Sequence, residues 1–310
     1  MIASNITEVL QDLFFVERGF LNANQLVYSG DPPELIDSGY IAYFQETASI
    51  LQHLGVAAEK VGRIITTHCH CDHIGGHRAI YERSGCSIWL HEIGKHFIES
   101  RDGWSTWWEY YHQQADFFPC AVGLTDGDKV RIGPHAFEVL HTPGHAADGI
   151  VLYDRKNRLL ISSDTLWQHD LPVHTVRVEG NAAVWQTQKS LEKISQLEVN
   201  TVCPGHGPLF TDFGAALQRG QNKIGQYLAD RRIIGTDVLK KITVYTVLMK
   251  QPVPVEGFFD DLMATNWFAE TVDLYFDSRY RAKYDEITGD FLKRGILKIK
   301  DEHYVTTVRP

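Results

Sequence analysis

The sequence predicts an α/β fold followed by a mainly helical C-terminal extension. Up to about residue 212, short β-branched runs that end in Gly, Pro or Asp alternate with segments whose apolar residues recur at helical spacing. From Ala215 to Pro310 helix-like segments dominate, and 15 Lys+Arg against 13 Asp+Glu give a net charge of +2, whereas the whole chain carries −9. We therefore expect an α/β domain at residues 1–214 and a helical domain at residues 215–310.

The individual elements follow from local patterns, in chain order. Strands are predicted at 24–29, 33–39, 61–68 and 86–92, and helices at 43–56 and 75–85. Strands are predicted again at 128–133, 136–145, 149–154, 158–166 and 200–207, with an amphipathic helix at 182–197. The extension is predicted to hold helices at 217–234, 237–251, 256–276 and 284–296, and a hairpin at 295–307 that turns at Asp301 and Glu302. A helix followed by a hairpin is a winged-helix-like ending.

The segment 104–118, "WSTWWEYYHQQADFF", is crowded with aromatic residues. We expect a helix that packs these large side chains into the core. The same side chains are also candidates for an apolar wall of a substrate pocket, and the two roles are compatible.

Composition narrows the classes of function. No apolar run approaches the ~20 residues that a membrane span needs. The N-terminus lacks the basic start and apolar block of a signal peptide, so we expect a cytoplasmic protein. The negative net charge does not favour general nucleic-acid binding. The five cysteines are odd in number and lack a framework spacing, which argues against structural disulfides.

Several metal-binding side chains stand at the ends of the predicted strands. The run "HCHCDH" at 68–73 lies on a strand-to-helix turn, and "TPGH", "SSD" and "PGHG" end three later strands. Five histidines and two carboxylates are too many donors for one tetrahedral zinc and suit two ions that share a carboxylate. Imidazole with carboxylate favours Zn, Fe or Mn. The candidate ligands are His68, His70, Asp72, His73, His145, Asp164 and His206.

The order H-x-H-x-D-H, T-P-G-H, S-D-T and P-G-H-G resembles the metallo-β-lactamase superfamily, in its glyoxalase II-like, dinuclear hydrolase branch. The resemblance covers roughly residues 20–212 and implies the family's αββα sandwich. Gly75 and Gly76 match the family's glycines after the first motif, where the backbone must run close to the metal turn. The family pattern implies that one metal is bound by His68, His70 and His145, and the other by Asp72, His73 and His206. Asp164 would bridge both metals. Asp37 in "LIDSG" would be the hydrogen-bond acceptor that fixes the ligand imidazoles from behind.

Cys69 and Cys71 alternate with the first two histidines. If His68 and His70 face the metal, both thiols point away from it, so we do not expect thiolate ligation. Asp164 stands where common zinc β-lactamases have cysteine, and His70 stands where flavodiiron proteins have glutamate. Between Asp164 and His206 lie 41 residues, too few for the large insertion of the nuclease branch.

The resemblance implies hydrolysis by a metal-bridged hydroxide, with Asp72 able both to ligate and to orient it. A small-molecule thioester or ester is the favoured substrate. Glutathione thioesters are disfavoured, because the tail lacks the basic pattern of true glyoxalase II. Three alternatives stay open: an acyl-homoserine lactonase, whose family usually has a tyrosine helper that we could not assign here; a ribonuclease or phosphodiesterase; and a ligand-binding or regulatory protein on the same scaffold.

The loop after Asp164 is where the family often builds its substrate pocket, so Trp167, His169 and His174 are weak pocket candidates. A homodimer through the C-terminal region is a further expectation, and no membrane or nucleic-acid partner is expected.

Overall fold

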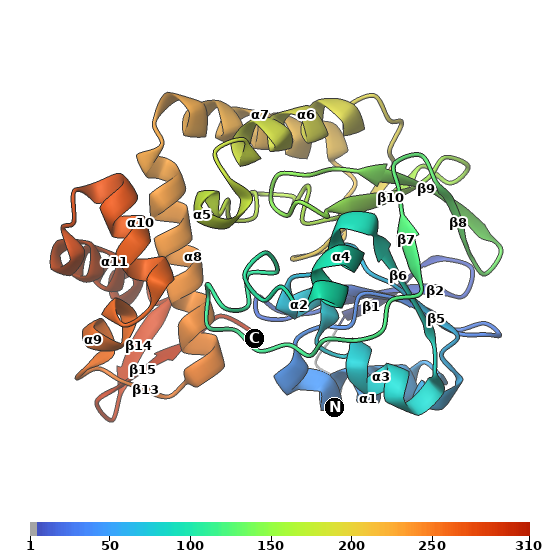
Figure 1. Cartoon of the computed structure of the whole chain (residues 1–310), viewed down its shortest axis with the longest axis horizontal. Helices are drawn as coiled ribbons and strands as arrows, with labels where there is room; N and C mark the ends of the chain where they lie inside the picture. Colours follow the sequence, from blue (N-terminus) through green and yellow to red (C-terminus); the bar gives the residue numbers. More distant parts are fainter. Residues whose placement is uncertain (1–4) are drawn as a thin grey trace.

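The computed structural model describes residues 5–310 and shows two sheets packed face to face between helices (Figure 1). Helices α6 and α7 lie outside one sheet, and α1 and α3 lie outside the other. The last helices gather at one side of this sandwich, with α8 running alongside both sheets. Four layers are the αββα arrangement that the resemblance implied, and the α/β prediction is confirmed.

The first sheet has seven strands in sequential order. β1 to β4 pair antiparallel, and β4 to β7 pair parallel through helical crossovers. Its strands are β1 (Asn5–Leu10), β2 (Leu13–Glu17), β3 (Gln25–Tyr28), β4 (Glu34–Ile36), β5 (Arg63–Ile65), β6 (Ser87–His91) and β7 (Val122–Leu124). The helical segments between them are η1 (Ile41–Tyr43), α1 (Phe44–His53), η2 (Ala58–Lys60), α2 (Cys71–Ile74), α3 (His77–Ser84) and α4 (Glu92–Ser100).

The second sheet has five strands in the order β12-β11-β10-β9-β8. Only the pair β11 and β12 is parallel within it. Its strands are β8 (Lys129–Ile132), β9 (His135–His141), β10 (Ile150–Asp154), β11 (Leu159–Ser163) and β12 (Thr201–Pro204), and α5 (Val176–Glu179) and α6 (Ala183–Ile194) connect the last two.

The two sheets share a core of alternate side chains. Phe15, Ile36 and Ile65 of the first sheet meet Phe137 and Ile161 of the second, and each is at most 2% exposed. Full burial of such a side chain contributes about 1.5–3 kcal/mol. This core holds the strand ends of both sheets in a fixed relation, and the site lies at those ends.

The C-terminal region consists of five helices and a small sheet in the order β13-β15-β14. Its elements are α7 (Phe213–Ala229), α8 (Arg232–Lys250), β13 (Val253–Pro254), α9 (Phe258–Met263), α10 (Asn266–Phe276), α11 (Tyr280–Arg294), β14 (Leu297–Lys300) and β15 (His303–Thr306). The predicted hairpin is present, and Asp301 and Glu302 at its turn have positive φ. α7 begins before residue 215 and packs with α6 on sheet residues such as Val151, so the domain boundary stays a prediction.

The segment 104–118 is not a helix, contrary to expectation; it forms turns and irregular chain. Trp107 and His112 have φ of 72° and 52°, which no right-handed helix accommodates. The aromatic side chains are nevertheless buried: Trp107, Trp108, Tyr110 and Tyr111 are at most 6% exposed. The crowding of aromatic residues therefore predicted the burial correctly and the helical backbone wrongly.

Two further elements differ from the prediction, one in the C-terminal region and one near the N-terminus. The single helix predicted at 256–276 is two, α9 and α10, because the Thr265 side chain accepts a hydrogen bond from Phe268 N and caps the start of α10. The hairpin of β1 and β2 was not predicted.

Within residues 5–310, none of the helices combines the length and apolarity needed to cross a bilayer.

Candidate metal centre

All seven predicted ligands lie beyond strand ends that face one another across the sandwich. His68 and His70 follow β5, and Asp72 and His73 lie on the short helix α2. The other ligands follow β9, β11 and β12, which run in one direction because each is antiparallel to β10 or parallel to β11. Parallel strands bring their carboxyl ends to one edge, and this edge delivers His145, Asp164 and His206.

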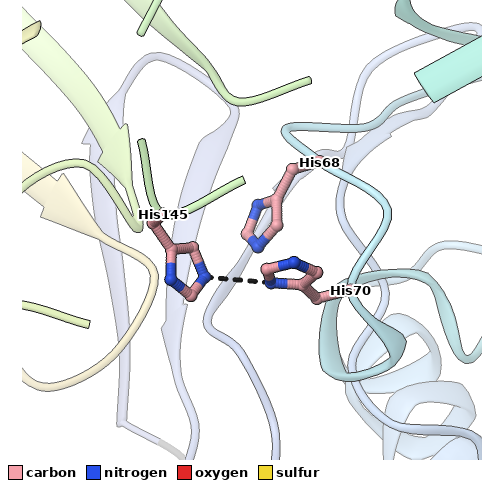
Figure 2. A group of neighbouring side chains, drawn as sticks. All are labelled: His68, His70 and His145. Carbon is pink, nitrogen blue, oxygen red and sulfur yellow. Dashed lines mark hydrogen bonds between the residues drawn. The ribbon is translucent and has the colours of Figure 1, made fainter. Parts of the chain in front are cut away.

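Three overlapping groups of side chains could each hold an ion, because their ligand atoms lie within 4.8 Å of one another. His68, His70 and His145 form the first subsite (Figure 2), in which His70 Nδ1 lies 2.9 Å from His145 Nε2. Asp72, His73 and His206 form the second subsite. The third group joins His68 and His73 to Asp164.

Asp164 lies between the two subsites. Its Oδ2 atom is 3.3 Å from His145 Nε2, 3.7 Å from His73 Nε2 and 3.8 Å from His206 Nε2. A carboxylate at these distances reaches ligands of both subsites, which is the geometry that a bridging role requires. That role, like the assignment of each ligand, remains a prediction.

The unpaired ring nitrogens fit metal ions. The Nε2 atoms of His68, His70 and His73 are buried without a hydrogen-bond partner in the described chain. Buried polar atoms in native proteins almost always have a partner, so these nitrogens fit contact with a bound cation. The donor set of imidazoles and carboxylates is the one that Zn, Fe and Mn accept.

Neighbouring oxygen atoms select the nitrogen that each histidine can offer. His73 Nδ1 donates to Asp37 Oδ2 at 2.8 Å, and His145 Nδ1 donates to the carbonyl of Val173 at 2.8 Å. His206 Nδ1 lies 3.3 Å from the carbonyl of Gly19. With the proton on Nδ1, the lone pair of Nε2 faces the cluster and is available to a metal.

Asp37 lies behind the ligands, where the family pattern implied it. Besides His73, its carboxylate accepts from Thr67 N at 2.8 Å and Thr67 Oγ1 at 2.7 Å, and it is 3% exposed. Thr67 in turn accepts a hydrogen bond from Ser163 Oγ at 2.7 Å, next to Asp164. Asp37 therefore ties the turns after β4, β5 and β11 together beneath the cluster.

Burial and charge divide the titratable groups of the cluster. Burial, and then the neighbouring His73, lowers the pKa of His68 well below its ordinary value. Burial opposes protonation of His73 too, but the carboxylates of Asp72, Asp37 and Asp164 raise its pKa well above its ordinary value. Burial would raise the pKa of Asp72, yet the charges of His73 and His206 lower it strongly. The centre thus holds its carboxylates ionised, as ligands must be.

The two cysteines of "HCHCDH" face away from the cluster, as expected. Cys69 Sγ contacts the carbonyl of Gly94 at 3.6 Å, and Cys71 Sγ contacts Gln113 Oε1 at 2.9 Å. Burial raises the pKa of both thiols well above the ordinary value. Gly75 also behaves as predicted, since a Cβ there would lie 2.0 Å from Ile41 N. The α2 turn therefore packs directly on the loop after β4.

A pocket opens onto the cluster. Its ligand side is formed by His70, Asp72, His145, Asp164 and His206, and its walls by Phe20, Trp107, Gln113, Trp167, Pro172, Val173, Lys241, Ile242 and Tyr245. Trp167 is thus at the pocket, whereas His169 is exposed and His174 is buried against Thr187. Those two candidates were wrong.

Trp107 supports the first subsite from the pocket wall. Its ring lies over His70, with ring centroids 3.8 Å apart and an interplanar angle of 31°. Its indole nitrogen donates to Glu179 Oε1 at 2.7 Å, and burial raises the pKa of Glu179 to about 8. The aromatic richness of 104–118 signalled this wall; nothing in the sequence signalled Glu179.

Tyr245 of α8 was also missed. Its hydroxyl donates to Asp72 Oδ2 at 2.6 Å across 173 positions of sequence. Burial, and then the charge of Asp72, raises the pKa of Tyr245 well above its ordinary value, so the hydroxyl stays a donor. A tyrosine therefore does stand beside the centre, contrary to the expectation that none was assignable. No motif marks it, because a helix far along the chain delivers it.

Comparisons with known proteins agree with this geometry. Residues of the chain are 30% identical over 122 positions to the hydroxyacylglutathione hydrolase of Rhizobium johnstonii, covering 39% of this chain and 40% of that protein. They are 22% identical over 230 positions to the human acyl-coenzyme A thioesterase MBLAC2, covering 66% of this chain and 80% of that protein. Some curated relatives are thus matched over about half of their length or less.

The fold of the whole chain is shared with a solved structure. The metallo-β-lactamase family protein TTHA1429 of Thermus thermophilus superimposes with a TM-score of 0.62 at 18% identity, covering 96% of this chain and 99% of that one. The coverage includes the C-terminal region. A family model described as the metallo-β-lactamase superfamily matches residues 18–206, more than half of the chain. The chain therefore belongs to the metallo-β-lactamase superfamily.

Proposed function

We propose that the protein is a metal-dependent hydrolase that cuts thioesters or esters. The observation that carries this proposal is the convergence of seven buried donors, three with orphaned Nε2 atoms, into one cluster, five of which line the pocket. Two divalent cations bound there would supply a nucleophilic hydroxide at neutral pH and a Lewis acid for the substrate carbonyl. Zinc is the proposed metal, and Fe or Mn suit the same ligands.

The chain's own residues hold and surround the substrate. Asp72 Oδ2 lies 3.1 Å from His206 Nε2 at the ligand side of the pocket, where it can orient an attacking water. Trp107, Trp167 and Ile242 give the opposite walls an apolar character that fits an acyl group and excludes bulk water. Lys241 also lines the pocket, with its ammonium paired to Asp170 Oδ2 at 2.8 Å and donating to the carbonyl of Leu171.

The preference for acyl substrates is supported by the relatives, because one is named an acyl-coenzyme A thioesterase and another a hydroxyacylglutathione hydrolase. Lactones are the second candidate, because lactonases of the acyl-homoserine type usually carry a tyrosine beside the centre and Tyr245 lines this pocket, with its hydroxyl hydrogen donated to Asp72 Oδ2. Both reactions place the same demands on the pocket, attack on an acyl carbon and loss of a thiol or alcohol.

A substrate panel tests the proposal. Protein loaded with zinc is assayed with acyl thioesters, acyl-homoserine lactones, a phosphodiester and single-stranded RNA. We expect turnover of thioesters, followed by lactones. Turnover of phosphodiesters or RNA alone would refute acyl hydrolysis, and full metal loading without any turnover would favour a ligand-binding or regulatory role.

Elemental analysis of protein purified without added metal tests the cofactor. We expect about two equivalents of divalent metal per chain, and one equivalent or none would contradict the dinuclear centre. A homodimer through the C-terminal region remains a proposal, which light scattering would test.

A further inference from the structure

The C-terminal region contributes a side chain to the metal centre. Helix α8 places Tyr245 so that its hydroxyl donates to Asp72 Oδ2 at 2.6 Å. Both residues are buried, at 9% and 6% exposure. The same Oδ2 atom lies 3.1 Å from His206 Nε2. The hydroxyl of Tyr245 therefore donates to a carboxylate oxygen that also faces a second candidate ligand.

The tyrosine is itself held firmly in place. The ring of Phe20 meets that of Tyr245 edge to face, with centroids 5.1 Å apart. Phe20 N donates to the carbonyl of Arg309 at 2.8 Å, and the neighbouring Gly19 carbonyl lies 3.3 Å from His206 Nδ1. The loop 19–20 thus connects the C-terminal region to a second ligand of the same subsite.

The first subsite has no comparable connection. Within residues 5–310, the polar contacts of His68, His70 and His145 are with Thr67, Asp164, Val173 and one another, and all of these lie outside the C-terminal region. His70 also packs on Trp107. The C-terminal region therefore supports the two subsites unequally.

We propose that Tyr245 is a positioning residue that orients Asp72, so that the second subsite depends on the C-terminal region and the first does not. The proposal rests on the metal centre of the proposed function. Groups that hydrogen-bond to a metal ligand set its orientation, and their loss typically weakens metal binding about 10–100-fold. Without the phenol hydroxyl, the Asp72 carboxylate loses this hydrogen-bond donor and turns more freely.

The variant Tyr245→Phe removes the hydroxyl and keeps the ring. Full-length protein is stripped with a chelator and titrated with Co²⁺ ions, and binding is followed by visible absorption and calorimetry. We expect one ion to bind as in the wild type and the other about 10–100-fold more weakly. With a thioester, kcat at limiting metal should fall and recover when excess metal is added, whereas KM should stay unchanged.

Tyr40→Phe is the matched control. Its hydroxyl donates to Met249 Sδ of the same helix α8 and accepts from Gln114 N, but it does not contact a candidate ligand. We expect this variant to bind both ions normally. Comparable urea unfolding of the two metal-free variants would show that α8 stays docked.

Two results would overturn the inference alone. Either both ions bind to Tyr245→Phe as tightly as to the wild type, or both subsites weaken to the same extent, which would indicate a general structural effect. A wild-type protein that binds no Co²⁺ would instead refute the proposed function itself, and the inference with it.

Discussion

Asp37 offers a sharp test, because its carboxylate supports both the backbone of the metal turn and a ligand. Asp37→Ala removes the acceptor of Thr67 N and of His73 Nδ1, two buried donors, and leaves His73 Nδ1 only the longer contact of 3.3 Å with Thr67 Oγ1. Leaving a buried donor unsatisfied costs about 1–3 kcal/mol. The metal-free variant should therefore lose about 2–6 kcal/mol of unfolding free energy, measured by urea denaturation.

Metal binding should weaken in the same variant. His73 loses the hydrogen bond that directs its Nε2 at the cluster, and such a loss costs about 10–100-fold in affinity. Competition with a chromophoric chelator measures this directly. Asp37→Asn, which keeps the shape and tolerates the local φ of 59°, should be intermediate because its amide presents a donor as well as an acceptor.

Asp154→Ala separates general destabilisation from the effect on metal. Asp154 is 2% exposed and accepts from Asn157 N and Nδ2 at a turn that contains no candidate ligand. It should lose stability but keep the metal affinity of the wild type. If Asp37→Ala also kept that affinity, the idea that Asp37 orients His73 would be refuted.

Three further predictions concern the centre and its surroundings. Asp164→Ala should lose metal and hydrolysis together, and retention of two metals by elemental analysis would argue against bridging. Burial lowers the pKa of His77 to about 3, so the folded protein favours the neutral imidazole. The contribution of His77 to the free energy of unfolding is therefore complete above its unfolded pKa of about 6.5 and is lost as the pH falls towards 3. The test is urea denaturation of His77→Gln between pH 4 and 7, a range chosen around and below the unfolded pKa of ~6.5. Its free energy of unfolding should depend less steeply on pH than that of the wild type, by up to about 1.4 kcal/mol per pH unit, and an unchanged slope would contradict this assignment. Trp107→Phe leaves Glu179 without its indole donor and should cost about 1–3 kcal/mol and raise KM for thioesters, whereas an unchanged KM would remove Trp107 from the substrate wall.

The candidate ligands that the structure brings together and most of the sandwich could be predicted from the sequence by itself. Each ligand stands where a β-branched run stops, and strand ends are local features that apolar runs and turn residues specify. His68 and His145 are therefore recognisable without knowledge of what they contact. The orientation of Cys69 away from the cluster followed from simple alternation along an extended chain.

The backbone of 104–118 and the contribution of the C-terminal region were decided only by tertiary structure. Trp107 adopts a positive φ because its ring packs on His70 and its indole reaches Glu179, and these long-range contacts override the local pattern. Tyr245 lies in a helix of ordinary periodicity, and its role depends on how α8 docks beside the sheets. A contact across 173 positions leaves no trace in local spacing, because it is set by the packing of whole elements rather than by neighbouring residues.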